Sequence, residues 1–259
     1  MIPLASFVSS HEPEIISGNK HDSLGPVPYL ERLSIVVPVG PGDDSWQVLL
    51  ESLSELPESA EVWLIGIQAE PVEFSRSRER IGCQMKWIVA PKGRARQMNA
   101  GARLSQGEFL WFLHADSQFT SDALVALNAS LATASDSVHY FDLSYQTDGP
   151  AAARLNAWGV WLRSHLLKLP FGDQGLCMNR ATFERLRGFP EDALYGEDHL
   201  LVWQAHRQRV PLRAVGATLS TSARKYRDQG WLKTTALHVW RTWKQAFPQL
   251  IALLWSRVR

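Results

Sequence analysis

Cysteine, net charge and long apolar runs are all scarce in this chain of 259 residues. The two cysteines, Cys83 and Cys177, have neither the spacing of metal ligands nor the number of a disulfide framework, which favours buried free thiols in a reducing compartment. With 27 basic and 26 acidic residues, no global charge draws the chain to nucleic acid. No run reaches the roughly 18 apolar residues of a membrane span, and no secretory signal opens the sequence. We therefore expect a cytoplasmic protein.

Short apolar runs alternate with helical segments through the first half of the chain. The central run, at 109–113, is too short for a helix and suits a strand covered on both faces. Further strands are expected at 33–39, 61–67, 85–89 and 138–145, and helices at 45–56, 93–104 and 121–133. This alternation predicts an α/β fold with a mostly parallel central sheet flanked by helices.

The second half has a different texture. It predicts helices at 151–169 and 200–208, short strands at 176–178 and 211–215, a basic loop at 220–227, and a tryptophan-rich helical region at 231–259 interrupted at Pro248. Residues 1–30 lack periodicity and are expected to form a flexible leader. We expect one domain at 31–228, with halves at 31–117 and 118–228, followed by a C-terminal helical region at 229–259.

Polar residues gather where the predicted strands end. Arg94, Asp116, Asp173 and the Glu197-Asp198 pair would meet at one edge of the sheet, where ligands bind in open α/β folds. Clustered carboxylates repel one another unless a cation or a proton offsets the repulsion, and oxygen ligands suit Mg²⁺ or Mn²⁺ shared with phosphates. Arg94 at a helix start could pair with a diphosphate. The pattern suggests a site for a metal-bound nucleotide diphosphate.

Several ordered motifs together resemble one enzyme family. The segments LSIVVPV, GRARQMNAGA, FLHAD, GDQG and GFP followed by GEDHLL occur in the order seen in family 2 glycosyltransferases. They are most similar to the branch with a GRARQMNAGA-like helix, an LHAD segment and a GDQ segment. The resemblance spans about 33–227 and implies a GT-A fold with a nucleotide-binding half (31–117) merged with an acceptor half (118–228). It also implies inverting, divalent-metal-dependent transfer of a sugar from a nucleotide diphosphate donor to an acceptor hydroxyl.

The resemblance also assigns roles to residues. Asp116 would hold the metal and the diphosphate, and His114 would contact the donor, although a strand-capping role for His114 stays open. Asp198 would be the general base, with Glu197 beside it; otherwise these two are simply acids favoured by a helix dipole. The nucleotide would lie against four residues, Pro38, Val39, Gly93 and Arg94, and the donor-sugar and acceptor pocket against Asp173 and Gln174.

Two loops depart from the family pattern. After the second strand, 65–70 reads IGIQAE and lacks the usual nucleoside-binding aspartate, for which Glu70 is a weak substitute. The loop at 40–43 reads GPGD where an Asn-Glu pair is common. A binding protein without catalysis therefore stays an alternative. A sugar nucleotidyltransferase is less favoured because 40–43 is acidic, and an oxidoreductase is disfavoured because no G-x-G-x-x-G follows the first strand.

Basic residues near the C-terminus have two interpretations each. Arg224 and Lys225 either grip the diphosphate from a closing loop or form an exposed turn. The C-terminal tryptophans, among basic residues, either pack onto the acceptor half or contact a membrane peripherally, where a lipid-linked acceptor would lie. The residues leave both questions open.

Overall fold

The computed structural model describes residues 26–258, so most of the predicted leader at 1–30 lies outside the described residues. In the part that is described, Val27 and Leu30 are buried and pack into the main core. The short 3-10 turn Leu30–Arg32 then leads into the first strand. The first strand of the sheet therefore follows this packed segment directly in the sequence.

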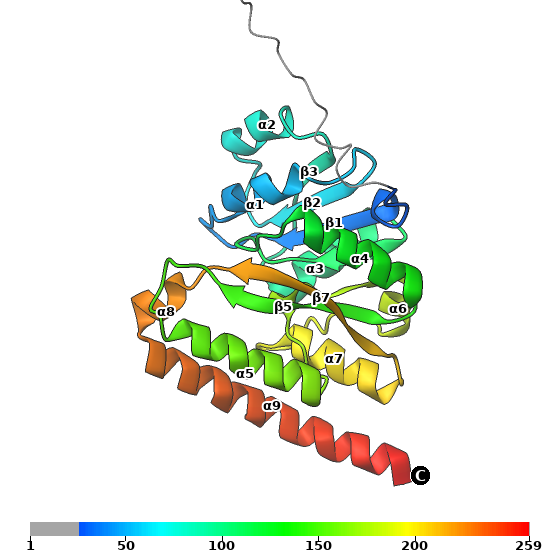
Figure 1. The fold of residues 1–259 in the computed structure, drawn as a ribbon, viewed down its shortest axis with the longest axis vertical. Helices are drawn as coiled ribbons and strands as arrows, with labels where there is room; N and C mark the ends of the chain where they lie inside the picture. Colours follow the sequence, from blue (N-terminus) through cyan, green and yellow to red (C-terminus); the bar gives the residue numbers. More distant parts are fainter. Residues whose placement is uncertain (1–25, 259) are drawn as a thin grey trace, which may run out of the picture.

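A seven-stranded sheet runs through the described residues in the order β3-β2-β1-β4-β6-β5-β7 (Figure 1). The strands β1 to β4 are parallel to one another, β6 is antiparallel to both β4 and β5, and β7 is parallel to β5. The prediction of an α/β fold with a mostly parallel sheet is confirmed. The strand bounds are β1 (Leu33–Pro38), β2 (Glu61–Gly66), β3 (Gln84–Val89), β4 (Phe109–Phe112), β5 (Val138–Tyr145), β6 (Cys177–Asn179) and β7 (Leu212–Thr221).

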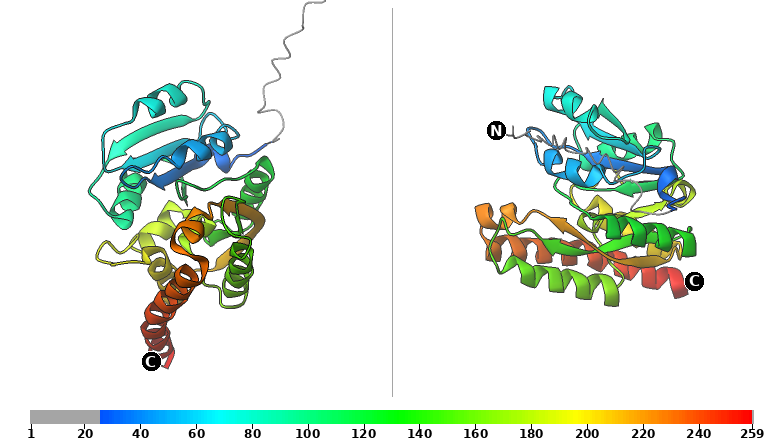
Figure 2. Two further views of the ribbon diagram at one scale, coloured as in Figure 1. Left: turned by 90° about the vertical axis from the view of Figure 1, so that its left-hand side faces the viewer. Right: turned by 45° about the horizontal axis from the view of Figure 1, so that its top comes forward.

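Helices cover both faces of the sheet. One core contains residues of α1 (Trp46–Leu53), α2 (Val72–Arg78) and α4 (Ser121–Thr133). The core on the other face contains residues of α3 (Arg94–Leu104), α6 (Arg180–Arg185), α7 (Glu197–Arg207) and α9 (Trp231–Val258). The helix α5 (Ala153–Leu166) packs on β5, and Figures 1 and 2 show α5 and α9 on the side of the molecule farthest from β1, β2 and β3. The short helix α8 (Arg224–Gln229) precedes α9.

The period of two along each strand divides the apolar side chains between these cores. In β1, Ile35 and Val37 join the core under α1 and α4, whereas Val36 joins the core under α3. In β4, Trp111 joins the first core and Phe112 the second. Both strands are buried along their whole length, as expected for strands covered on both faces. These short apolar runs explain why the sequence predicts the central strands of the sheet.

Helix α3 lies unusually close to the sheet because of Gly101. A Cβ atom at Gly101 would lie 2.4 Å from Cγ1 of Val36 and 3.2 Å from Cγ1 of Ile65. No real side chain tolerates the shorter distance without moving its neighbour. Glycine therefore sets the height of α3 above β1 and β2.

Near the C-terminus, one predicted strand is present but longer than expected, and one predicted loop is wrong. The strand predicted at 211–215 and the loop predicted at 220–227 are instead a ten-residue β7, paired up to Thr221 with Tyr145 of β5, and the helix α8. Asp148, far away in sequence, accepts hydrogen bonds from the Ser222 hydroxyl and the Ala223 N–H and so fixes the start of α8.

The predicted interruption at Pro248 is also absent, because α9 is continuous from Trp231 to Val258. Proline removes one helical hydrogen bond and strains the preceding turn. Ala246 and Leu253, on either side of Pro248, are both buried against the second core. We infer that this packing holds the helix together across the proline.

Candidate functional site

The site lies at the carboxyl edge of the parallel strands, where α3 begins. Gln97 in the first turns of α3 donates its side-chain N–H₂ to the carbonyl oxygens of Val39 (2.8 Å) and Ile65 (2.5 Å), which follow or end β1 and β2. The side chain of Gln97 is 4% exposed, so it acts inside the protein and fixes the helix to both strand ends. Gly93 precedes the helix with φ of 137°, a conformation that favours glycine. This places Arg94 at the sheet edge.

Arg94 connects two of the predicted site segments. Its Nε lies 2.9 Å from Oε1 of Glu197 at the start of α7, and its Nη2 contacts Nε2 of His114 after β4. A guanidinium only donates hydrogen bonds, so Nε2 of His114 must accept and carry no proton. Burial first, and Arg94 second, lower the pKa of His114 to about 3, against an opposing effect of Asp198. His114 is therefore a neutral imidazole at physiological pH.

Asp198 is held in its charged form. Its Oδ2 accepts a hydrogen bond from the Gly172 N–H, and its Oδ1 accepts one from the His199 N–H at 2.9 Å. Burial raises the pKa of Asp198, but Arg94, these two N–H groups and His114 together bring that pKa below its usual value. A Cβ atom at Gly172 would lie 2.7 Å from Oδ2 of Asp198. The backbone can therefore approach the carboxylate so closely only because Gly172 has no side chain.

Glu197, beside Asp198, differs in its surroundings. Its side chain is 11% exposed, and burial, together with the charge of Asp198, raises its pKa although Arg94 opposes the shift. Glu197 is thus mainly the ion-pair partner of Arg94. The carboxylate of Asp198 is the group that stays ionised at the start of α7, because its pKa is lowered. The favourable end of the α7 dipole adds to the stabilisation of both acids.

Asp173 lies in the short turn Gly172–Gln174 that packs against Asp198. Burial raises the pKa of Asp173 to about 6; Asp198 and Asp116 add to this rise, while Arg163 and Arg94 oppose it. Its Oδ1 is buried and has no hydrogen-bond partner among the described residues. A buried carboxylate oxygen without a donor indicates a group waiting for a ligand or a proton.

Asp116 faces the same space from the segment after β4. Burial first, and Asp43 in addition, raise its pKa, while hydrogen bonds from the Thr221 hydroxyl and the Ser222 N–H lower it. These contacts connect the β4 edge to the end of β7. The charges of Asp116 and Asp173 act on one another, so the predicted metal-binding residue and the predicted pocket residue share one site.

Gln174 occupies a different position from the other predicted pocket residues. It is fully buried, and its Nε2 donates to the Phe141 carbonyl (2.9 Å) and to the Ser164 hydroxyl (3.2 Å). Its Oε1 accepts from the Phe171 N–H at 3.1 Å and from Arg163 at 3.3 Å. Gln174 therefore holds the Asp173 turn from inside the protein.

Arg224 and Lys225 reach the site from α8. Arg224 donates to Ser45 Oγ at 2.7 Å, after β1, and to Ser222 Oγ at 3.0 Å, and so joins the two halves of the chain. Lys225 Nζ lies 3.1 Å from Nε2 of His238 on α9. Burial, Arg241 and Arg94 lower the pKa of Lys225. The charge of Arg94 therefore acts on Lys225, and the two cations contribute to the same positive region.

A pocket of about 200 Å³ opens between the loops that follow β1 and β2. It is lined by Val39, by the acidic pair Asp43 and Asp44, by Gln68 and by Trp87, among others. Glu70 does not line it: its carboxylate accepts from Ser75 Oγ at 2.6 Å and lies 3.7 Å from Arg78 of α2. The acidic residues that line this pocket are therefore Asp43 and Asp44 from the loop after β1 and Glu73 from α2. Pro38 and Ile65 are paired neighbours at the ends of β1 and β2 beneath these loops.

Sequence reasoning missed Arg163. It stacks on Phe171, with its guanidinium carbon 3.4 Å from the ring centre, and donates to the Leu169 carbonyl at 2.8 Å. Burial lowers its pKa, while Asp173, Asp198 and two tyrosines raise it, so it is the second cation of the site. The available signal was an arginine inside an otherwise apolar stretch of α5.

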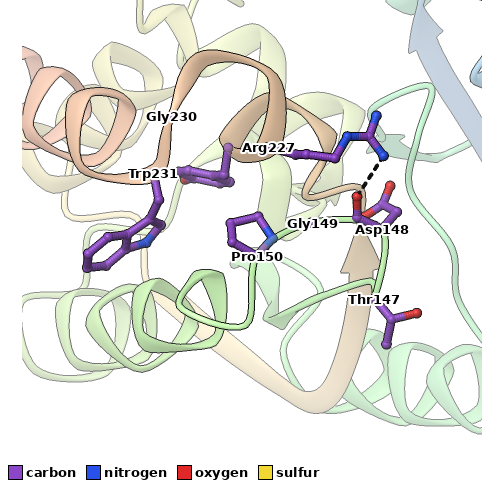
Figure 3. A pocket seen from close by; sticks show the side chains of 8 residues that line it. Thr147, Asp148, Gly149, Pro150, Arg227, Gly230 and Trp231 are labelled. Carbon is purple, nitrogen blue, oxygen red and sulfur yellow. Dashed lines mark hydrogen bonds between the residues drawn. The ribbon is translucent and has the colours of Figure 1, made fainter.

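The two tyrosines, Tyr145 and Tyr226, were missed as well. Their hydroxyl oxygens lie 3.3 Å apart, and burial followed by the charge of Asp173 raises the pKa of Tyr145. Tyr226 also lines an open cavity of about 630 Å³ between the loop after β5 and the start of α9 (Figure 3). There Arg227 donates to the Asp148 carbonyl at 3.1 Å. Tyr226 thus lines this cavity and also contacts Tyr145, which is itself affected by the charge of Asp173.

The carboxylates of the site offer a partial set of ligands for a divalent cation. Within residues 26–258, no three His, Cys, Asp or Glu side chains form a ready-made metal cage. The half-buried Asp116 and the buried bare oxygen of Asp173 nevertheless offer carboxylate oxygens whose charges act on one another. Mg²⁺ and related ions commonly use one or two carboxylates and complete their shell with water and phosphate. The residues fit a cation shared with a bound diphosphate.

No family model matches the chain, and no curated protein matches its sequence. Solved structures match its fold. The mannosyltransferase PcManGT from Pyrobaculum calidifontis, in complex with GDP-Man and Mn²⁺, gives a TM-score of 0.62 at 18% identity, covering 87% of this chain and 68% of that one. A TarS fragment from S. aureus in complex with UDP-GlcNAc gives 0.57 at 16% identity, covering 73% and 58%.

GalNAc-T7 with UDP, GalNAc and Mn²⁺ gives a TM-score of 0.55 at 12% identity, covering 73% of this chain and 43% of that one. The chain spans only 37% of another, longer TarS structure. At these identities the likeness shows the fold, which is GT-A-like. That part of the sequence-based expectation is confirmed.

Proposed function

We propose that this protein is an inverting, family 2-like glycosyltransferase that moves a sugar from a nucleotide diphosphate to an acceptor hydroxyl. The observation that carries the proposal is the pairing of a charged Asp198 with the Arg94–His114 contact at one edge of a GT-A-like fold. This edge combines a proton acceptor with donors for a diphosphate. An ordinary surface ion pair would not bring together four buried or half-buried acids and two arginines.

In this proposal Asp198 is the general base. Inversion requires the acceptor hydroxyl to attack from the side opposite the leaving diphosphate, so the base must face the acceptor. The hydrogen bonds from Gly172 and His199 hold both oxygens of Asp198 and fix the direction of its remaining lone pairs. Asp173, next to it, would line the donor sugar, and Gln174 would keep that turn in place.

Arg94 and the backbone at Gly93 would bind the diphosphate from the start of α3. His114, as a neutral imidazole, could donate its remaining N–H to a donor oxygen. Arg224 and Lys225 would approach the leaving phosphate from α8. Asp116 would hold a divalent cation, Mg²⁺ or Mn²⁺, which when bound stabilises the charge on the leaving diphosphate.

The nucleoside would occupy the pocket of about 200 Å³ after β1 and β2, against Val39 and the acids Asp43 and Asp44. These acids stand in for the aspartate that the loop after β2 lacks. Pro38, which is buried at the end of β1, would support this pocket from beneath. The acceptor would enter from the half that contains Tyr226, next to the cavity of about 630 Å³. In this scheme 31–117 binds the nucleotide and 118–228 binds the acceptor.

Calorimetric titration of UDP, GDP and their sugars, with and without Mn²⁺, tests the proposal on wild type and Asp116→Ala. We expect metal-dependent binding of one nucleotide, weakened at least roughly tenfold by Asp116→Ala because the cation loses a charged ligand. Asp122→Ala, which removes an exposed carboxylate from α4, is the matched control. Binding without turnover would favour a binding protein, and no binding under any condition would refute the proposal.

A further inference from the structure

Helix α9 presents an exposed aromatic surface. Its outward residues include Trp240, Trp243, Phe247 and Trp255, which are 57%, 64%, 64% and 68% exposed. We call these four residues the aromatic face. Large exposed apolar side chains that gather on one face mark an interaction site more often than single scattered ones do.

Neighbouring α5 extends this surface. Asn156 of α5 donates to the Thr235 hydroxyl of α9 at 3.0 Å, and Figures 1 and 2 show the two helices side by side. On α5, Trp158 is 67% exposed and Leu166 is 69% exposed. The exposed apolar residues therefore belong to two adjacent helices.

The inner side of α9 is firmly attached to the protein. Gln245 donates to the Tyr195 carbonyl at 2.9 Å and lies 2.9 Å from Nδ1 of His199. Ala246 and Leu253 are buried in the core beneath α7. The outward exposure of the aromatic face is thus a property of a docked helix, and the same helix braces the segment that contains Glu197 and Asp198.

The charge of this surface has one sign. Neither Ala153–Leu166 nor Trp231–Val258 contains an aspartate or a glutamate. Lys233, Arg241 and Lys244 are exposed on α9, and Lys244 lies 4.9 Å from the ring centre of Trp240. In a symmetric contact with a second copy, this cationic surface would meet itself and repel. Its complement is an anionic surface that accepts tryptophan.

We propose that α9, together with α5, docks this protein on the surface of an anionic lipid bilayer. A helix with tryptophan and basic residues lies in the plane of the membrane interface, its aromatic rings at the headgroups and its cations on lipid phosphates. No helix among residues 26–258 is long and apolar enough to cross a bilayer, so the contact is with one leaflet. The inference rests on this surface alone and does not depend on sugar transfer.

Sedimentation of the full chain with vesicles tests the proposal. We expect partitioning onto vesicles of phosphatidylcholine containing about one third phosphatidylglycerol to exceed that onto pure phosphatidylcholine by roughly tenfold or more, and to fall as salt is raised. Lys233→Glu with Lys244→Glu should lower it at least roughly tenfold, since each cation contributes to the attraction. Arg76→Glu with Arg80→Glu, exposed in and after α2, should change it little.

The aromatic contribution is tested separately with Trp240→Ser, Trp243→Ser and Phe247→Ser combined. We expect a similar or larger loss, whereas Val48→Ser, Val72→Ser and Val125→Ser, which alter exposed apolar residues on α1, α2 and α4, should retain binding. Circular dichroism checks that each variant folds. If the aromatic variant fails to fold, quenching of wild-type tryptophan fluorescence by brominated phosphatidylglycerol gives the answer instead.

Absence of quenching, or equal partitioning onto neutral and anionic vesicles, would overturn the proposal. So would loss of binding in the control variants to the same extent. Concentration-dependent dimerisation that the aromatic variant abolishes, without vesicle binding by wild type, would identify a second copy as the partner. Nucleotide binding by the vesicle-defective variants, measured in solution, separates a failure of docking from a failure of the proposed transferase activity.

Discussion

Two adjacent segments each bring one aspartate to the site, and their surroundings treat the two carboxylates oppositely. At 196–199, both oxygens of Asp198 accept backbone hydrogen bonds and its pKa is lowered. At 171–175, Oδ1 of Asp173 has no partner among the described residues and its pKa is raised to about 6. Burial raises both pKa values, so the difference comes from the backbone donors and the charge of Arg94 at Asp198, and from the repulsion of Asp198 and Asp116 at Asp173. The same side chain thus becomes a fixed anion in one segment and a titrating group in the other.

The strongest test of this contrast is Asp198→Asn. If Asp198 is the base, kcat should fall by about 10²- to 10⁴-fold, the usual contribution of a general base, while donor affinity changes little. Turnover of the nucleotide sugar identified by titration measures the first quantity and calorimetry the second. Asp192→Asn, an exposed residue of the preceding loop, is the control. A variant that keeps more than about a tenth of wild-type kcat would assign the base elsewhere.

The second test is Asp173→Asn, which concerns stability. The native pKa of about 6 lies above the ordinary aspartate value of 3.8, so the folded state binds the proton more tightly than the unfolded state. Stability is therefore fully present below about pH 4 and is lost as pH rises through 6. Removing the charge should raise the free energy of unfolding by about 2 kcal/mol at pH 8 and by little at pH 4.

Urea denaturation of both proteins at the two pH values measures this effect. Asp122→Asn, on the exposed side of α4, should show no such pH-dependent gain. Equal stability of wild type and Asp173→Asn at pH 8 would mean that the bare oxygen of Asp173 costs nothing. In that case only the lowered pKa of Asp198, and not a raised pKa of Asp173, would distinguish the two segments.

The smallest expected effect is an absence of titration at His114. Its pKa is lowered to about 3 by burial and by Arg94, so its ring should stay neutral between pH 5 and 8. Nitrogen chemical shifts of the histidine rings, assigned with His114→Gln, would show no change for this residue over that range. A midpoint near 6.5 would instead mean that Arg94 does not hold this ring as the structure indicates.

The first half of the fold was predictable because each strand is a short apolar run followed by a turn. The centre of the sheet, the start of α3 at Arg94 and the start of α7 at Glu197 follow from such local patterns. The rule that ligands bind at the carboxyl ends of parallel strands accounts for Arg94 after β3 and Asp116 after β4. It does not account for Asp173, which precedes the antiparallel β6, or for Asp198, which lies at the start of α7.

The rest depended on contacts between distant residues. The start of α8 is fixed by Asp148, 75 residues before Ala223, and α9 passes through Pro248 because of packing beneath it. Arg163 enters the site from a helix whose pattern is dominated by tryptophan and leucine. The partners of Gln174 likewise come from three separate segments. No local pattern contains that information.

Gly101 has a consequence for the site that lies well away from it. Seven residues of helix, about 10 Å at 1.5 Å per residue, separate Gly101 from Arg94. The helix acts as a rigid lever that rests on the sheet at Gly101 and carries a guanidinium at its far end. A methyl group at position 101, as in Gly101→Ala, would push this part of α3 away from the sheet. The resulting tilt of the helix would move Arg94 away from Glu197 and His114. The position of Arg94 thus depends on the absence of a Cβ atom at Gly101.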